Sequence, residues 1–193
     1  MFLPYGKLKK PCMKKAIIGA FVGGIIIFMV QFLVWTVLNV HYKSMAYTPK
    51  QDTILNYLNS QNLPSGQYLM PGVKPDATSA EKQAHMTESA GKPWAIVSYH
   101  KTQNTNMGMS MVRSFLTDVL VVLLLCWILL KINAPTFGTI LLACLLTAAI
   151  VYLNSDYTFH IWYQSAGQKG YIIEYTAQWG LVGIWLGWWL RRK

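Results

Sequence analysis

The most chemically informative side chains in this sequence are polar groups inside long apolar runs. Asp118 lies in the first third of the run 111–131, which is long enough to cross a bilayer, since about 20 mostly apolar residues suffice. A carboxylate at that depth is costly, so it needs a partner, a proton or a wet cavity. We therefore take Asp118 as the first candidate functional residue.

Further polar side chains are expected at a depth similar to that of Asp118. One polar group of each apolar run falls roughly 10 Å inward from its expected outer end: Gln31, Asp118, Thr147 and Gln178. Glu174 lies one helical turn outward from Gln178 on the same face, and Arg113 enters at a depth that would allow it to pair with Glu174. This polar layer is either an outward-opening site that senses protons or contacts a substrate, or a set of interhelical hydrogen bonds worth about 0.6 kcal/mol each.

A second candidate site combines methionine with histidine. Met107, Met109 and Met111 occupy alternate positions just outside the run 111–131, and His100 precedes them. Thioether and imidazole groups suit Cu(I). The spacing of Met107 to Met111 resembles that of Met-rich motifs in periplasmic copper proteins, which implies copper binding. Methionine is also common packing material, so copper is a third hypothesis and no other cofactor is expected.

The sequence favours a non-catalytic protein. It contains no Gly-rich phosphate loop, His-Glu-x-x-His, Cys-x-x-Cys or Gly-x-Ser-x-Gly motif. Its three cysteines are Cys12, Cys126 and Cys144, and none lies in a segment expected to be exported. A disulfide-stapled exported domain is therefore not expected.

The composition predicts an α-helical membrane protein. Of the 193 residues, 53% are hydrophobic and only 12% are charged. Four apolar runs have the length of membrane spans: 16–40, 111–131, 135–153 and 171–190. Short connections between the later runs predict antiparallel neighbours, and thus a four-helix transmembrane bundle.

Small residues in the first and last runs are expected to allow close helix packing. These candidate packing positions are glycines: Gly19, Gly23, Gly180, Gly183 and Gly187. They would pair the first run with the fourth, or they would present a face to another subunit.

The distribution of basic residues predicts the orientation. Basic residues cluster in the leader 1–15, at Lys131 and in the tail 191–193, with no acidic residue nearby. This positive-inside pattern places both termini in the cytoplasm and indicates a bacterial inner-membrane protein. It also accounts for much of the net charge of +10, so no nucleic-acid partner is expected.

The segment 41–110, between the first two runs, is polar and predicts a small extracytoplasmic α/β insertion. A capping box at 48–51 opens a helix, 67–70 is a short strand, 78–91 is a second helix closed by Gly91, and 94–100 is a second strand. Such a unit is marginally stable alone, so we expect it to lie on the membrane or against a partner. A second outer segment, 154–170, is predicted to be a loop.

These expectations favour an accessory, assembly or scaffold subunit of the membrane. Its partners would be the lipid bilayer and either a protein partner or further copies of itself. The alternative is a small transporter or proton-coupled module that uses the polar layer around Asp118.

Overall fold

The computed structural model describes residues 13–192, which form two compact units. The bundle unit comprises the described residues up to Ala46 and those from Asn106 onward. The insertion unit comprises Tyr47–Thr105. The expected leader is described only from Met13, so Cys12 lies outside the described residues.

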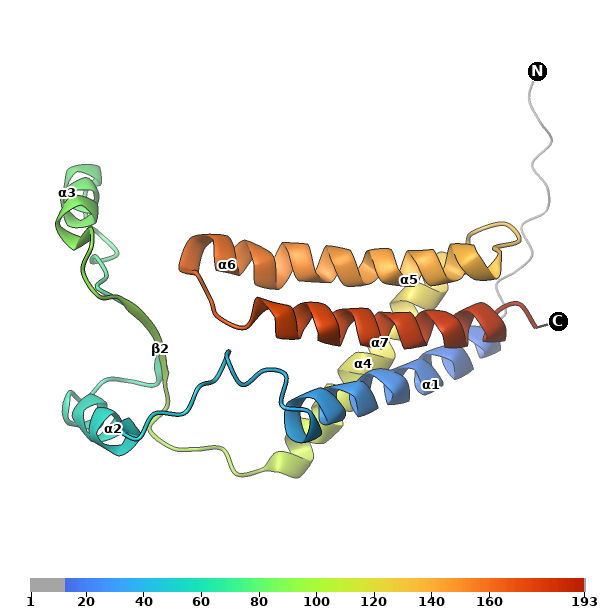
Figure 1. The fold of residues 1–193 in the computed structure, drawn as a ribbon, viewed down its shortest axis with the longest axis horizontal. Helices are drawn as coiled ribbons and strands as arrows, with labels where there is room; N and C mark the ends of the chain where they lie inside the picture. The colour runs from blue at the N-terminus through green and yellow to red at the C-terminus, as the bar shows by residue number, and fades with distance from the viewer. Residues whose placement is uncertain (1–12, 193) are drawn as a thin grey trace, which may run out of the picture. The chain divides into compact units, whose positions relative to one another are not determined.

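The bundle unit consists of long helices and their helical extensions (Figure 1). In chain order they are α1 (Met13–Phe32) with a π-helical turn η1 (Leu33–Val37), α4 (Met107–Leu129), α5 (Phe137–Tyr152) with a π-helical turn η2 (Leu153–Tyr157), α6 (Thr158–Tyr163) and α7 (Gln168–Trp189). Helix α4 packs along α1, α1 along α7, and α7 along α5.

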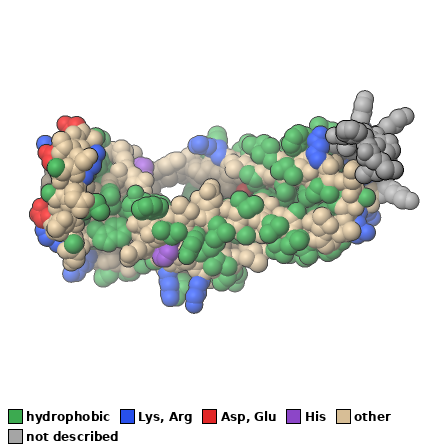
Figure 2. All heavy atoms as spheres, turned by 90° about the horizontal axis from the view of Figure 1, so that it is seen from above, with side chains coloured by type: hydrophobic (Ala, Val, Ile, Leu, Met, Phe, Trp, Pro, Cys, Tyr) green, Lys and Arg blue, Asp and Glu red, His purple; other side chains and the backbone are tan. Residues whose placement is uncertain are grey.

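Three stretches of helix within residues 13–192 are long and apolar enough to cross a membrane: Met13–Val37, Met107–Leu129 and Phe137–Tyr163. The chain is therefore a mostly helical membrane protein, as its composition predicts. Hydrophobic side chains cover much of the visible face of the bundle (Figure 2), as expected for helices whose outer faces contact lipid.

Side-chain caps fix where two of these helices begin. The Asn106 side chain accepts a hydrogen bond from the Met109 backbone N–H at 3.0 Å, and the Thr136 side chain accepts one from the Thr139 backbone N–H at 3.1 Å. Such caps satisfy backbone donors that the first helical turn leaves unpaired. Val122 and Cys126 of α4 then join Ile140 of α5 in the fully buried core.

The segment 154–170, predicted to be a loop, is helical as far as Tyr163. Two polar side chains of this segment are hydrogen-bonded while the backbone stays helical. The Thr158 hydroxyl donates to the Leu153 carbonyl at 2.7 Å, and Asp156 Oδ2 accepts from the Tyr175 hydroxyl of α7 at 2.7 Å. Gln164, at φ 46°, ends the helix in a left-handed conformation. The connection to α7 is therefore much shorter than the sequence predicts.

The glycines allow close packing, but mostly with helices other than the expected pair. A Cβ added to Gly23 would lie 2.7 Å from Val122 Cγ1 of α4, and one added to Gly183 would lie 2.9 Å from Leu141 Cδ1 of α5. Gly180 and Gly187 also face α5, opposite Leu145 and Phe137. Only Gly19 faces α7, where a Cβ would lie 3.1 Å from Leu186 Cδ2. The α7 glycines therefore bring α7 close to α5 rather than to α1.

The insertion unit contains the predicted order of helix, strand, helix and strand. Its elements are α2 (Gln51–Ser60), β1 (Gly66–Met70), α3 (Ser79–Ser89) and β2 (Ala95–Tyr99). The strands are antiparallel, with Gly66 opposite Tyr99 and Met70 opposite Ala95.

The helix ends of the insertion unit differ in how well the sequence predicts them. Thr78 and Glu81 form a full capping box at α3, and Gly91 has the positive φ of 74° that glycine tolerates best. The capping box predicted at 48–51 is not formed. Lys50 is the N-cap of α2 and its side chain makes no capping bond, while the Thr48 hydroxyl accepts from the Lys50 N–H instead.

Candidate functional site

A group of buried polar side chains inside the bundle unit is the candidate functional site. Within residues 13–192, four polar or charged residues are buried, with exposed fractions of 2–5%: His41, Asp118, Glu174 and Gln178. Three of them belong to the predicted polar layer. His41 does not, because the sequence places it outside the membrane runs.

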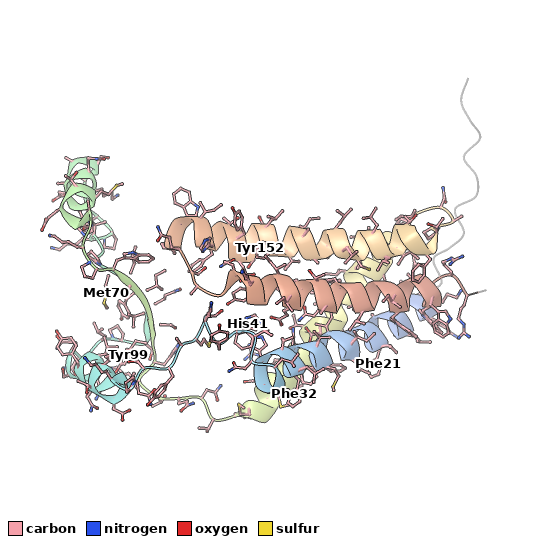
Figure 3. All side chains as sticks on the ribbon, viewed as in Figure 1. Phe21, Phe32, His41, Met70, Tyr99 and Tyr152 are labelled. Atoms are coloured by element: carbon pink, nitrogen blue, oxygen red, sulfur yellow. The ribbon has the colours of Figure 1, made fainter. Side chains whose placement is uncertain are left out.

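His41 reaches the interior because the chain turns back after η1. The Val40 N–H donates to the Val34 carbonyl at 3.0 Å, and Asn39 adopts a left-handed conformation at φ 47°. Asparagine tolerates this region better than most residues do. The turn brings His41 from the end of η1 to the side of α7 (Figure 3).

His41 forms a close contact with Glu174 of α7. The distance from His41 Nε2 to Glu174 Oε2 is 2.7 Å, and the Gln178 side-chain amide donates to Glu174 Oε1 at 2.8 Å. Both carboxylate oxygens of Glu174 therefore have a polar neighbour.

Two aromatic rings enclose the imidazole of His41. The Trp35 ring stacks on it at a centroid distance of 4.1 Å and an interplanar angle of 8°, and Tyr171 lies 4.8 Å away. Nδ1 of His41 has no hydrogen-bond partner among the described residues. The rings hold the imidazole against the carboxylate and exclude water from it.

The expected pair between Arg113 and Glu174 does not form. Arg113 is exposed, and none of the ion pairs within residues 13–192 includes it. Helix α4 packs along α1 rather than along α7, so Arg113 is not directed at Glu174. His41, rather than Arg113, is the cationic partner candidate that contacts Glu174.

Asp118 forms a second cluster, between α4 and α1. The Gln31 amide donates to Asp118 Oδ1 at 3.3 Å, and the Ser114 hydroxyl donates to Gln31 Oε1 at 3.3 Å. Asp118 Oδ2 is buried and has no hydrogen-bond partner within the described part of the chain. Among the described residues no hydrogen bond or ion pair joins Asp118 to Glu174, so the two clusters are distinct; together we call them the buried network.

Thr147 does not join this network. Its hydroxyl donates to the Ala143 carbonyl at 2.9 Å within α5, the back-bonding that helical threonines commonly make. The polar layer therefore draws on three helices and the turn that carries His41, instead of on four helices.

The methionines do not converge on one point. Met107, Met109 and Met111 are all exposed in the first turns of α4, where alternate residues project roughly 200° apart. Met109 therefore points away from the other two. His100 follows β2 in the insertion unit, and its Nε2 lies 3.4 Å from the Ser98 hydroxyl. Copper binding by these residues stays a prediction.

The buried network contains three titratable side chains in the interior of the bundle unit. Two are carboxylates, and the histidine is the only one of the three that can become a cation. Removing one member of such a buried pair is strongly destabilising, because the remaining charge is left without compensation. The arrangement can therefore hold the helices in register, and it can also bind or release protons.

The sequence signals for His41 are weak but present. Asn39, two residues before it, favours a turn, and Trp35, six residues before it, supplies a flat apolar partner. No known protein family, curated protein or solved structure matches the chain, so the function is argued from these contacts.

Proposed function

We propose that this chain is a non-catalytic accessory or scaffold protein of a bacterial inner membrane, whose insertion unit binds a protein partner outside the cytoplasm. The observation that carries the proposal is the lack of a core in the insertion unit. Across residues 47–105, Tyr99 alone is buried, with an exposed fraction of 5%. Neither α2 nor α3 buries any residue.

Large apolar side chains of the insertion unit are exposed instead. The exposed fraction is 53% for Leu55, 65% for Tyr57, 67% for Met86 and 47% for Trp94. Several large apolar side chains exposed on one small unit are typical of a surface that contacts a protein or a membrane. A unit of about 60 residues is also near the lower limit for independent folding, so a binding partner would supply missing burial.

The proposal includes a fourth span formed by α7. This helix has 22 residues, enough to cross the hydrocarbon core, and it packs between α1 and α5. Its polar residues Glu174 and Gln178 lower its mean hydropathy, but both are buried inside the protein rather than exposed to lipid. A helix with such interior polar groups spans a membrane when the bundle satisfies them.

Contacts near the two ends of the described chain support a shared side for the termini. The Trp189 indole donates to the Lys15 carbonyl at 2.9 Å, and the Lys15 ammonium donates to the Arg192 carbonyl. Lys14, Lys15, Arg191 and Arg192 thus gather at one end of the bundle. By the positive-inside rule this end faces the cytoplasm, and the opposite end, which includes His41, faces outward.

The test compares two cysteines on α2, introduced one at a time into a Cys12→Ser background and labelled with a membrane-impermeant maleimide. In native membranes we expect Ser60→Cys to react and Leu55→Cys to be protected, because a partner would cover the apolar side of α2 and Ser60 lies on the other side of this helix. In liposomes that contain only the purified protein, both should react. Equal labelling of Leu55→Cys in both settings contradicts partner binding, and protection in the liposomes assigns this face to lipid.

The buried network favours a second candidate, a proton-coupled module. The two buried carboxylates and the histidine can each bind or release a proton, and Asp118 Oδ2 has no hydrogen-bond partner among the described residues. Under an imposed pH gradient, proteoliposomes should take up protons, and Asp118→Asn should abolish this uptake. Asp52→Asn, on the exposed α2, is the control. Equal uptake by wild type and Asp118→Asn would exclude this function.

A further inference from the structure

A hollow lies at the end of the bundle unit that carries His41. Its volume is about 760 Å³, and its walls come from the turn after η1, from α6 and from the start of α7. The residues that line it include Lys43, His160 and Lys169, and none of its lining residues is acidic. The hollow is therefore a basic pocket at the bundle end that is proposed to face outward.

The amino end of α7 adds to this positive character. The N-cap of α7, Gly167, lines the hollow and provides no side-chain cap, and the first turn of α7 contains no acidic residue. The start of a 22-residue helix attracts anions through its unpaired N–H groups and its dipole. Lys43 and Lys169 would meet the same anion as this helix end.

The remaining wall is apolar. Leu38, Val40 and Ile173 line it, and Leu38 and Ile173 are exposed on the surface of the bundle. A free inorganic anion would leave this wall without a partner. An amphiphile with an anionic head and an alkyl chain would use both parts of the hollow.

We propose that the hollow binds the head group of an anionic phospholipid. Lys43, Lys169 and the amino end of α7 hold the phosphate. The first acyl carbons lie against Leu38 and Ile173. This site is separate from the partner-binding insertion unit, so either proposal can fail without the other.

The experiment uses the purified full-length chain and native mass spectrometry with phosphatidylglycerol, phosphatidylcholine or inorganic phosphate. We expect phosphatidylglycerol to bind more tightly than phosphatidylcholine. The double variant Lys43→Gln/Lys169→Gln should weaken phosphatidylglycerol binding by about tenfold to thirtyfold, as expected for the loss of two lysines near a lipid head group. The matched control is Lys74→Gln/Lys82→Gln, which removes two exposed lysines from the insertion unit and should leave binding unchanged.

Three outcomes would overturn the proposal. Equal binding of the two lipids would exclude recognition of the anionic head. Unchanged phosphatidylglycerol binding by the Lys43→Gln/Lys169→Gln variant would place the lipid elsewhere. Displacement of phosphatidylglycerol by millimolar inorganic phosphate would identify the hollow as a site for the free anion.

Discussion

Replacing His41 with alanine is expected to lower the free energy of unfolding by about 3–5 kcal/mol, the range seen when one partner of a buried ion pair is removed. Glu174 would lose its contact at 2.7 Å while remaining buried beside Gln178. Trp35 and Tyr171 would also lose the ring that they enclose. The effect should be a large drop in the thermal unfolding midpoint of the protein in detergent.

Two further variants distinguish loss of the His41–Glu174 contact from a general loss of stability. The double variant His41→Ala/Glu174→Gln should recover part of the stability, because the neutral amide no longer leaves a buried charge unpaired. His100→Ala, at an exposed position of the insertion unit, should leave the midpoint unchanged. If His41→Ala unfolds at the wild-type temperature, the network does not stabilise the bundle.

Gly24→Ala is expected to destabilise the contact between α1 and α4 by about 1–3 kcal/mol, the usual consequence of overpacking. A Cβ at Gly24 would lie 2.9 Å from both the Cα and the backbone N of Val119. Backbone atoms cannot rotate away as a side chain can, so the two helices must separate. The gain of about 1 kcal/mol in helix propensity from glycine to alanine offsets only part of this loss.

Gly180→Ala is the matched control for Gly24→Ala. A Cβ at Gly180 would meet only Leu145 Cδ2, at 3.8 Å, which is an ordinary van der Waals contact. We therefore expect Gly180→Ala to leave the unfolding midpoint unchanged or slightly higher. Similar losses in the two variants would show that the glycines act through backbone flexibility rather than through close helix approach.

The sequence predicts the elements better than the contacts between them. Apolar runs of membrane length are recognisable without a partner, because every face of such a helix is apolar. In the insertion unit, turn residues such as Gly91 and the capping pair Thr78 and Glu81 act locally, so the order of helices and strands follows from short stretches of sequence.

The sequence does not reveal which residues meet across the bundle. The Arg113 prediction fails because depth along a helix says nothing about the direction of a side chain. The sequence does not predict that His41 is buried, because the chain reverses its direction at Asn39 and thereby places the His41 side chain in the interior. Gly24 is missed because the spacing of Gly19 and Gly23 draws attention to one face, while the closest contact with α4 is made by the adjacent residue.

We propose above that α7 spans the membrane and brings Glu174 into the interior of a four-span bundle. Membrane-impermeant labelling of intact spheroplasts distinguishes this topology from one in which α7 does not cross, with single cysteines placed at Gln164, at Asn133 and after Lys193 in a Cys12→Ser background. We expect Gln164→Cys to react from outside, whereas Asn133→Cys and the appended cysteine react only after permeabilisation. Labelling of both Gln164→Cys and the appended cysteine from the same side would show that α7 does not cross the membrane.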